Sequence, residues 1–183
     1  ASPDGTPVDL GTPPVRDICD ADVQVTNDAP ELYPLGETVV TWTATDASGN
    51  VSTDEQLVTV VDTTPPELTM SVSPDSIWPP NHKMVTIVAS IEVSDICDAD
   101  PEVSLVSVES NEPANGNGDG NTEPDIEGAE IGTDDREFRV RAERAGPGNG
   151  RIYTVTYMAE DDSDNTTPAE DHIRVDHDQG NGN

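Results

Sequence analysis

The side chains of this chain that could do chemistry are mostly carboxylates, and six of them recur at a fixed spacing. The sequence Asp-Ile-Cys-Asp-Ala-Asp begins at residue 17 and again at residue 95. Three carboxylates in so short a loop can direct several oxygen atoms at one Ca²⁺, which takes about 6–8 oxygen ligands. Alternatively, the first Asp of each loop only caps a turn through its own backbone. We predict as ligands Asp17, Asp20, Asp22, Asp95, Asp98 and Asp100.

A second group of oxygen donors lies in a Gly-rich segment, residues 109–150, that has no counterpart in the first half of the chain. A segment with so little apolar content is flexible by itself, and bound Ca²⁺ would supply the missing order. Its spacing does not match an EF-hand loop. We predict as ligands Asn111, Glu112, Asp119, Asp125 and Asp134, with Asn117, Asn121 and Asp135 as further donors. Asp62, beside the linker, is predicted to share a cation with the second unit.

Catalytic patterns are not found. The histidines, His82, His172 and His177, lack zinc-ligand spacing, and the sequence contains no G-x-S-x-G, phosphate-binding loop or C-x-x-C motif. Among 38 acidic residues a carboxylate pair suited to glycoside hydrolysis carries no information. Trp42 and Trp78 could stack on sugars, but we expect Trp42 to fill a core and Trp78 to pack against proline. We therefore predict no catalytic residues.

The charge is strongly acidic, with 38 acidic against 8 basic residues and a net charge of −30. Such a chain repels nucleic acid and anionic membranes. The acids either solvate the protein or meet divalent cations, and both interpretations can hold together. Five basic residues cluster between Arg136 and Arg151. They form either a docking patch for an acidic partner or internal ion pairs, and we favour internal pairs.

The elements that would position these residues are β-strands. Thr38–Ala44 alternates apolar and polar residues, Gln56–Val61 is rich in β-branched residues, and residues 46–50 between them are turn formers. The same frame returns as residues 156–165. No stretch shows helical periodicity, so an all-β fold is predicted. Further strands are expected at Val8–Leu10, Val23–Val25, Glu67–Val72, Met84–Val93, Val103–Val108, Phe138–Arg141, Ile152–Met158 and Ile173–Val175.

The first unit resembles a hyalin repeat, through Pro34-Leu35-Gly36, Thr41 to Asn50 and Asp62 to Pro66. The second is similar to a related module of bacterial secreted proteins, through Trp78 to Met84, Ser110 to Pro113, Gly132 to Arg136 and Arg141 to Arg144. These resemblances imply two tandem immunoglobulin-like β-sandwiches in an extracellular, often adhesive protein. We place the units at residues 1–62 and 63–183, with the insertion at residues 109–150.

Two departures from the hyalin pattern matter. Neither Cys19 nor Cys97 has the partner cysteine that many hyalin repeats place after the Asp-Ala-Ser-Gly-Asn turn, so buried free thiols are favoured over a disulfide. The opening strand of the first unit is also predicted to be missing: either the chain was cut from a longer protein, or another chain supplies the strand. An incomplete sandwich exposes an edge to which another strand can add.

These features favour a non-catalytic, calcium-stabilised extracellular structural or adhesive protein. Its partners would be other copies of itself, other surface proteins or polysaccharide. Self-assembly into filaments or tubes by strand addition is the leading hypothesis. The alternative is a C-terminal spacer or carbohydrate-binding module of a larger secreted protein. No transmembrane span or signal peptide is visible, and a start at Ala1 fits a processed secreted product or a fragment.

The cation hypothesis predicts that Ca²⁺ raises the midpoint of thermal unfolding and that a chelator reverses the rise, because ligands that bind only the folded state stabilise it. Calorimetry with Ca²⁺, with chelator and with added NaCl of equal ionic strength separates site binding from charge screening. If NaCl raised the unfolding midpoint as much as Ca²⁺ does, the acidic residues would only solvate the protein and would not bind Ca²⁺ at specific sites.

Overall fold

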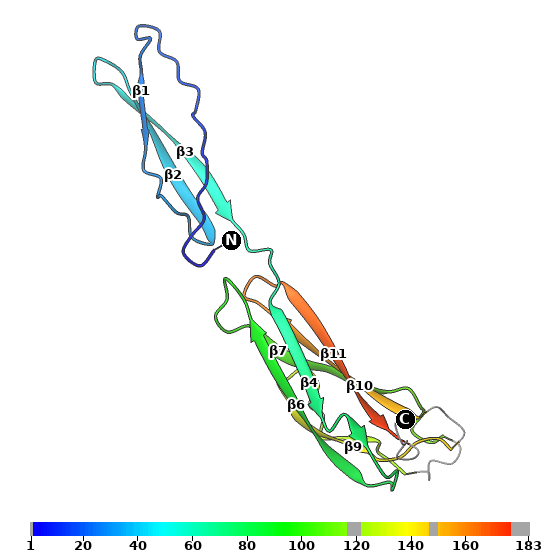
Figure 1. Cartoon of the computed structure of the whole chain (residues 1–183). Coiled ribbons are helices and arrows are strands. Elements are labelled where there is room, and N and C mark those ends of the chain that lie inside the picture. Colours follow the sequence, from blue (N-terminus) through cyan, green and yellow to red (C-terminus); the bar gives the residue numbers. More distant parts are fainter. Residues whose placement is uncertain (1, 117–121, 147–149, 177–183) are drawn as a thin grey trace, which may run out of the picture. The chain divides into compact units, whose positions relative to one another are not determined.

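The computed structural model describes residues 2–116, 122–146 and 150–176. This part of the chain contains eleven β-strands and no helix, so the fold is all-β as predicted (Figure 1). It accordingly holds no helix long and apolar enough to cross a membrane. The chain divides into two compact units, Ala1–Thr64 and Pro65–Asn183, and each is described separately.

The first unit is built on one antiparallel sheet. Its three strands are β1 (Gln24–Asn27), β2 (Gly36–Thr45) and β3 (Val51–Val60), in the order β1-β2-β3. Strands β2 and β3 pair along ten residues each, from Gly36 opposite Val60 to Thr45 opposite Val51. A small core of Tyr33, Val40 and Val58 packs on this sheet, with Leu10, Ala29 and Val60 partly buried around it.

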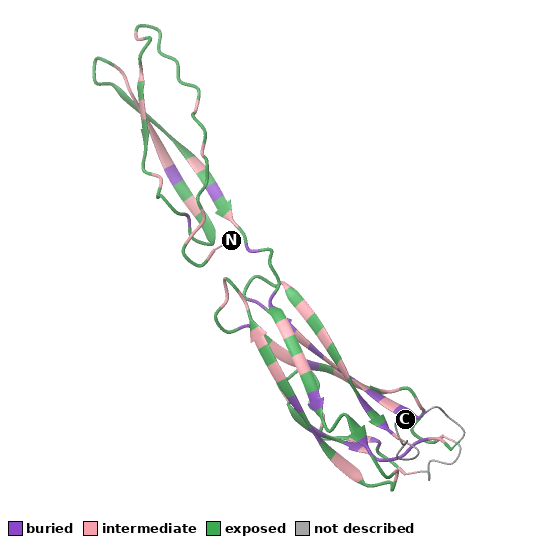
Figure 2. Ribbon diagram, in the orientation of Figure 1, coloured by how far each residue is buried: buried purple, intermediate pink, exposed green. Residues whose placement is uncertain are grey.

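The second unit is a β-sandwich of two four-stranded sheets, in the orders β5-β11-β10-β7 and β4-β6-β9-β8. Strand β10 alternates between buried and half-buried residues, because one face of its sheet packs against the other sheet (Figure 2). The core includes Ile87, Leu105, Phe138, Tyr153, Tyr157 and Ile173. The strands are β4 (Glu67–Ser73), β5 (Ser76–Ile77), β6 (Met84–Ser94), β7 (Glu102–Ser110), β8 (Ile126–Glu127), β9 (Glu137–Arg141), β10 (Arg151–Glu160) and β11 (Thr166–Val175).

The predicted strand at Val8–Leu10 is wrong. Its counterpart beside the second DICDAD loop is β6, which pairs with β4 on one edge and β9 on the other. In the first unit, residues 7–16 have no such neighbouring strands and form no strand themselves. An extended segment becomes a β-strand only when its backbone N–H and C=O groups hydrogen-bond to an adjacent strand. Instead of two sheets, the first unit thus has one sheet and a single extended segment.

The same turn closes the long hairpin in each unit. The Asp46 carboxylate accepts hydrogen bonds from the side chain and backbone of Asn50, and these hold the pKa of Asp46 below its ordinary value. Asp161 and Asn165 repeat the arrangement, and their hydrogen bonds outweigh the effect of burial, so the pKa of Asp161 is also lowered. Each turn has one residue in the left-handed region: Gly49, with φ of 85°, and Asp164, with φ of 63°.

The turn predicts opposite effects of two substitutions. Asp164→Gly should stabilise the second unit by up to about 1 kcal/mol, because glycine removes the left-handed strain. Gly49→Ala should destabilise the first unit by about 1 kcal/mol through backbone strain alone, since an added Cβ would meet no atom within 4 Å. Urea unfolding of the two variants measures both. A loss of stability in Asp164→Gly would contradict the strain argument.

Candidate functional site

The two DICDAD loops have the same hydrogen bonds. Asp17 Oδ1 accepts the N–H groups of Cys19 and Asp20, both at 2.7 Å. Asp95 Oδ1 accepts those of Cys97 and Asp98, at 2.7 and 2.8 Å. The first Asp therefore caps a turn in each loop, which is the alternative that the sequence left open.

The second Asp of each loop ties it to the neighbouring hairpin turn. Asp20 Oδ2 accepts the N–H of Ala47 at 2.7 Å, and Asp98 Oδ2 accepts the N–H of Asp162 at 3.0 Å. Their other oxygens accept the N–H groups of Asp22 and Asp100, both at 2.9 Å. The DICDAD carboxylates are thus structural clamps, and Ca²⁺ ligation by these loops stays a prediction.

One pair of carboxylates in the second unit has metal-like spacing. Oxygen atoms of Asp95 and Asp161 lie within 4.8 Å of each other, although Asp161 was expected only to build its turn. Asp161 is buried and Asp95 half-buried. Asp62 lies two residues after β3, where its Oδ1 accepts the N–H of Thr64 at 3.2 Å. The predicted sharing of a cation by Asp62 stays a prediction.

Neither Cys19 nor Cys97 forms a disulfide. Cys97 is half-buried, whereas Cys19 is exposed, so the prediction that both are buried is wrong for Cys19. The reason is the missing second layer, since the first DICDAD loop follows the uncovered residues 7–16.

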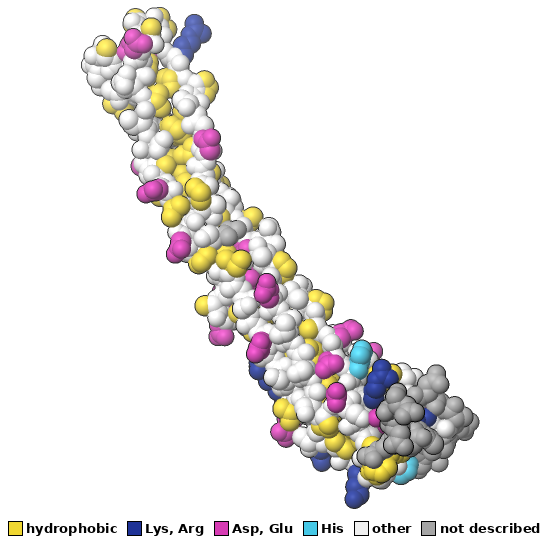
Figure 3. All heavy atoms as spheres, in the orientation of Figure 1, with side chains coloured by type: hydrophobic (Ala, Val, Ile, Leu, Met, Phe, Trp, Pro, Cys, Tyr) yellow, Lys and Arg dark blue, Asp and Glu magenta, His cyan; other side chains and the backbone are white. Residues whose placement is uncertain are grey.

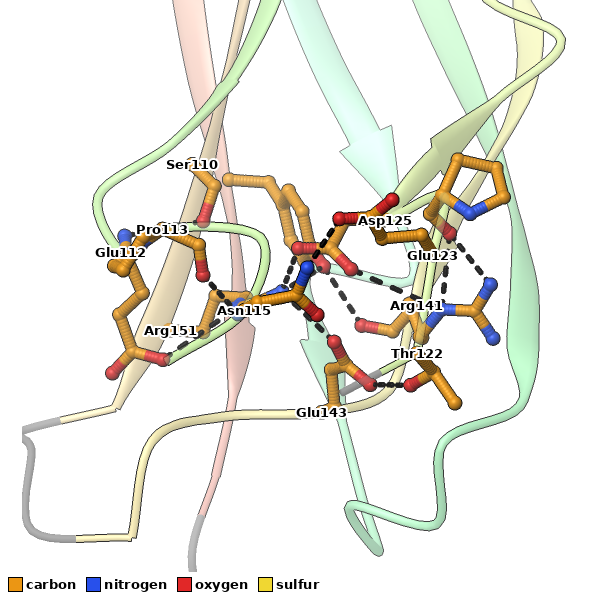
Figure 4. Close-up of polar contacts among 12 residues, drawn as sticks. Ser110, Glu112, Pro113, Asn115, Thr122, Glu123, Asp125, Arg141, Glu143 and Arg151 are labelled. Atoms are coloured by element: carbon orange, nitrogen blue, oxygen red, sulfur yellow. Dashed lines mark hydrogen bonds and ion pairs between the residues drawn. The ribbon is translucent and has the colours of Figure 1, made fainter. Parts of the chain in front are cut away.

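The insertion, residues 109–150, is organised around a buried arginine at the start of β10 (Figure 4). The Arg151 guanidinium is fully buried and pairs with Asp125, with Glu143 at 3.6 Å and with Glu112 at 3.4 Å. It also donates to the carbonyl oxygen of Pro113 at 3.0 Å. Burial disfavours its charge, yet Tyr153 and Asp125 hold the pKa of Arg151 above its ordinary value.

Asp125 and Glu143 are neighbours in this network, because both contact the same nitrogen of Arg151. Asp125 is 7% exposed and Glu143 is 0% exposed. Asp125 Oδ1 and Glu143 Oε1 have no hydrogen-bond donor among the described residues, and Arg141 Nε lies 3.9 Å from Asp125 Oδ1. Burial and the adjacent Glu143 raise the pKa of Asp125 to about 6 against the opposing effect of Arg151.

The other residues of the network fasten three segments together. The Tyr153 hydroxyl donates to the carbonyl oxygen of Arg141 at 2.9 Å. The Arg141 guanidinium donates to the carbonyl oxygens of His82, at 3.0 Å, and Pro124, at 2.6 Å. Thr122 and His82 both contact Glu143 Oε2. Asp125, Glu143 and Arg151 are buried, so the geometry of the network supports a structural role.

The predicted ligands of the insertion are held by protein groups. Asn111 Oδ1 accepts the N–H of Ile152 at 2.8 Å, and Glu112 accepts the N–H of Ala145 at 2.7 Å. Asp134 binds Arg136 through two hydrogen bonds, at 2.7 and 2.8 Å. Ligation of Ca²⁺ by these residues stays a prediction, and Asp119, Asn117 and Asn121 lie outside the described residues.

The arginine cluster is largely paired internally, as the sequence interpretation favoured. Arg136 pairs with Asp134, Arg139 with Glu127 at 2.9 Å, and Arg151 with the buried acids. Sequence reasoning missed Glu143 because its side chain is one acid among many. Its only signal was its position between arginines in Arg141-Ala142-Glu143-Arg144.

A hollow of about 340 Å³ lies on the first unit between the sheet and the extended segment. Its walls include Pro13, Val15, Val25 and Trp42. Trp42, expected in the core, is only half-buried, and its indole N–H donates to Gln56 Oε1 at 2.9 Å. Apolar side chains are visible over this unit in Figure 3. In a complete sandwich this space would be filled by core side chains.

No protein-family model and no curated protein matches the chain, so the resemblance to hyalin repeats stays a prediction. Among solved structures, the chain is similar to one described as "Structures of Clostridium thermocellum CbhA fibronectin(III)-like modules". The two share 16% sequence identity with a TM-score of 0.31. The match covers 81% of this chain and 66% of that chain, which is just under two thirds of its length.

The network predicts a large loss of stability when the side chain of Arg151, its central positive charge, is removed. Arg151→Ala should destabilise the second unit by about 3–5 kcal/mol, because it removes the buried cation that pairs with both Asp125 and Glu143. Arg139→Ala, which removes the exposed pair with Glu127, is the matched control and should cost less than about 1 kcal/mol. Chemical unfolding measures both, and equal effects of the two variants would contradict the central role of Arg151.

Proposed function

We propose that this protein is a non-catalytic extracellular structural module that self-associates by β-strand addition on its first unit. The observation that carries the proposal is the free edge of β3. In the sheet β1-β2-β3, this ten-residue strand lies at the edge and pairs only with β2 within the described residues. Edge strands present unpaired N–H and C=O groups on which another strand can hydrogen-bond.

The second unit shows how the same edge is satisfied elsewhere in this chain. Strand β11, the counterpart of β3, pairs on its outer edge with β5, where Val175 lies opposite Ile77. The backbone of Arg174 also donates to the carbonyl oxygen of Asp75 at 2.8 Å. In the first unit the described residues provide no such neighbour for β3, so its edge is available to another chain.

Apolar residues on the outer face of the first unit support an interface there. Val39 and Leu57 lie opposite each other on β2 and β3 and are 55% and 56% exposed. Val51 and Val61, at the two ends of the β3 region, are 62% and 63% exposed. A pairing strand would cover part of this surface, as β-augmentation does in other complexes.

The partner in the proposal is a second copy of the chain. Antiparallel pairing of two β3 strands about a twofold axis at Gln56 places Ser52 opposite Val60 and Asp54 opposite Val58, so no two carboxylates face each other directly. Each copy nevertheless carries a net charge of −30, so self-association requires screening by salt or neutralisation by cations.

Ca²⁺ is the proposed cation, and in the second unit its ligands would include Asp95 and Asp161. Their oxygen spacing of at most 4.8 Å suits two ligands of one Ca²⁺, and the lowered pKa of Asp161 keeps that group ionised. The Ca²⁺ titration described above, repeated on Asp95→Asn, tests this ligand pair without involving β3.

A second candidate function is polysaccharide binding, which the hollow beside Trp42 favours. The hydrogen bond to Gln56 fixes the indole plane, and Asp54 and Asn50 lie in the wall of the hollow. A half-exposed aromatic ring with polar groups around it is a common surface for sugars. A chain that stays monomeric and is retained on polysaccharide gels would replace self-association with this function.

Self-association predicts that the weight-average mass rises with protein concentration at physiological salt and rises further with Ca²⁺. Hydrogen exchange should then show added protection of β3 backbone amides. Light scattering and exchange mass spectrometry check these outcomes. A constant monomer mass at every concentration and Ca²⁺ level would overturn the proposal.

Paired proline variants sharpen this test. Along an antiparallel strand, neighbouring N–H groups point alternately to the two sides, so Thr53→Pro and Asp54→Pro affect opposite edges of β3. Proline is tolerated on an edge strand where its missing N–H faces solvent. The variant that keeps its stability should lose self-association, and retained association in that variant would exclude the β3 edge.

A further inference from the structure

The extended segment of the first unit, residues 7–16, has unused binding capacity of its own. Within the described residues, no backbone–backbone hydrogen bond joins this segment to the rest of the chain, whereas Thr6 just before it bonds Tyr33 in both directions. Val8 and Val15 are 36% and 41% exposed. The segment lies along the hollow, whose walls include Pro13, Pro14 and Val15.

The repeat shows which surface is left open. The β2 residues Trp42 and Ala44 correspond to Tyr157 and Ala159 of β10, which are both 0% exposed beneath the second sheet. In the first unit Trp42 and Ala44 are only half-buried. The difference arises because the first unit has no counterpart of β4 or β9, the strands that flank β6. The open face therefore lacks a layer of extended chain.

Two opposite charges flank the apolar part of this segment. Arg16 is the only basic residue of the first unit, is exposed and has no partner among the described residues. Asp9, at the other end, is exposed and accepts only the N–H of Gly11, at 2.9 Å. The two side chains do not pair with each other, so each is available to another molecule.

We propose that this segment packs antiparallel against the same segment of a second copy, with the Asp9–Arg16 pair formed twice across the interface. A twofold axis between Thr12 and Pro13 places Asp9 of one copy opposite Arg16 of the other. It also places Leu10 opposite Val15, which lines the hollow. The segment is therefore complementary to itself in both charge and apolar residues, as an isologous contact requires.

The contact depends on side chains more than on a backbone ladder. Pro13 and Pro14 supply no N–H, and Gly11 has φ of 66°, which is outside the β region. The hollow, about 340 Å³, gives apolar side chains of the partner copy a place to bury. Exposed ion pairs add little affinity, so here they select the partner and the register.

This inference rests on the proposed self-association and adds a second contact to it. The β3 edge alone, paired about a twofold axis, closes a dimer. A second, different twofold contact on the same unit lets each dimer join the next one. Two such contacts per copy give an open chain of copies, which is the filament predicted from the sequence.

The test exchanges charges between copies. Arg16→Glu alone places Glu opposite Asp9, and Asp9→Arg alone places Arg opposite Arg16, so each variant should self-associate on the order of tenfold more weakly through this contact. An equimolar mixture of the two variants restores both opposite-charge pairs and should recover wild-type association. Asp4→Arg, an exposed charge change on the same unit, is the control and should leave association unchanged.

Sedimentation velocity of the full chain in Ca²⁺ separates the outcomes. Recovery in the mixture, without recovery of either variant alone, supports the contact and also shows that both variants are folded. If both charge-reversal variants self-associate as strongly as the wild type, or if the mixture associates as weakly as either variant alone, this contact is overturned. Neither outcome affects the proposed pairing at the β3 edge. A wild-type chain that never associates overturns both the contact and the proposed function.

Discussion

The structure depends on whether each β-sheet has a second sheet to cover its apolar face. In the second unit, β4, β6 and β9 lie over β10 and β11, so Val155, Tyr157 and Ile173 are fully buried. In the first unit, the same turn and the same loop sequence surround a single sheet, and its buried core consists of Tyr33, Val40 and Val58. A sheet without a covering layer leaves apolar area in water, and burial of that area drives association.

The insertion shows a second way in which this acidic chain uses charge. Its net charge of −30 suggested that cations would order the Gly-rich segment. In the structure the chain supplies its own cations, because Arg151 and Arg136 hold the acids Asp125, Glu112 and Asp134. Arginine suits this task because its planar guanidinium stays charged when buried and has five donors. The insertion also contributes β9, which places Phe138 and Val140 in the core.

The buried network explains why the site was only partly predictable. The sequence predicts Asp125 and Glu112 as Ca²⁺ ligands, since oxygen donors in a Gly-rich segment are typical of Ca²⁺ loops, but it does not indicate their pairing with Arg151. Their arginine partner lies 26 residues from Asp125 and 39 from Glu112, and no local pattern joins residues so far apart. Glu143 was missed because it is one acid among many in the sequence, although it is fully buried.

The sequence by itself determined the all-β fold, the repeat, most strands and the two hairpin turns, because alternation, β-branching and turn chemistry act over a few residues. It also offered turn capping by Asp17 and Asp95 as one of two alternatives, and those hydrogen bonds are local. Only the tertiary structure decided that residues 7–16 form no strand, that Trp42 lines a hollow, and that Arg151 rather than a local group holds Asp125. These outcomes depend on which segments become neighbours in space, and that is decided by long-range pairing and burial.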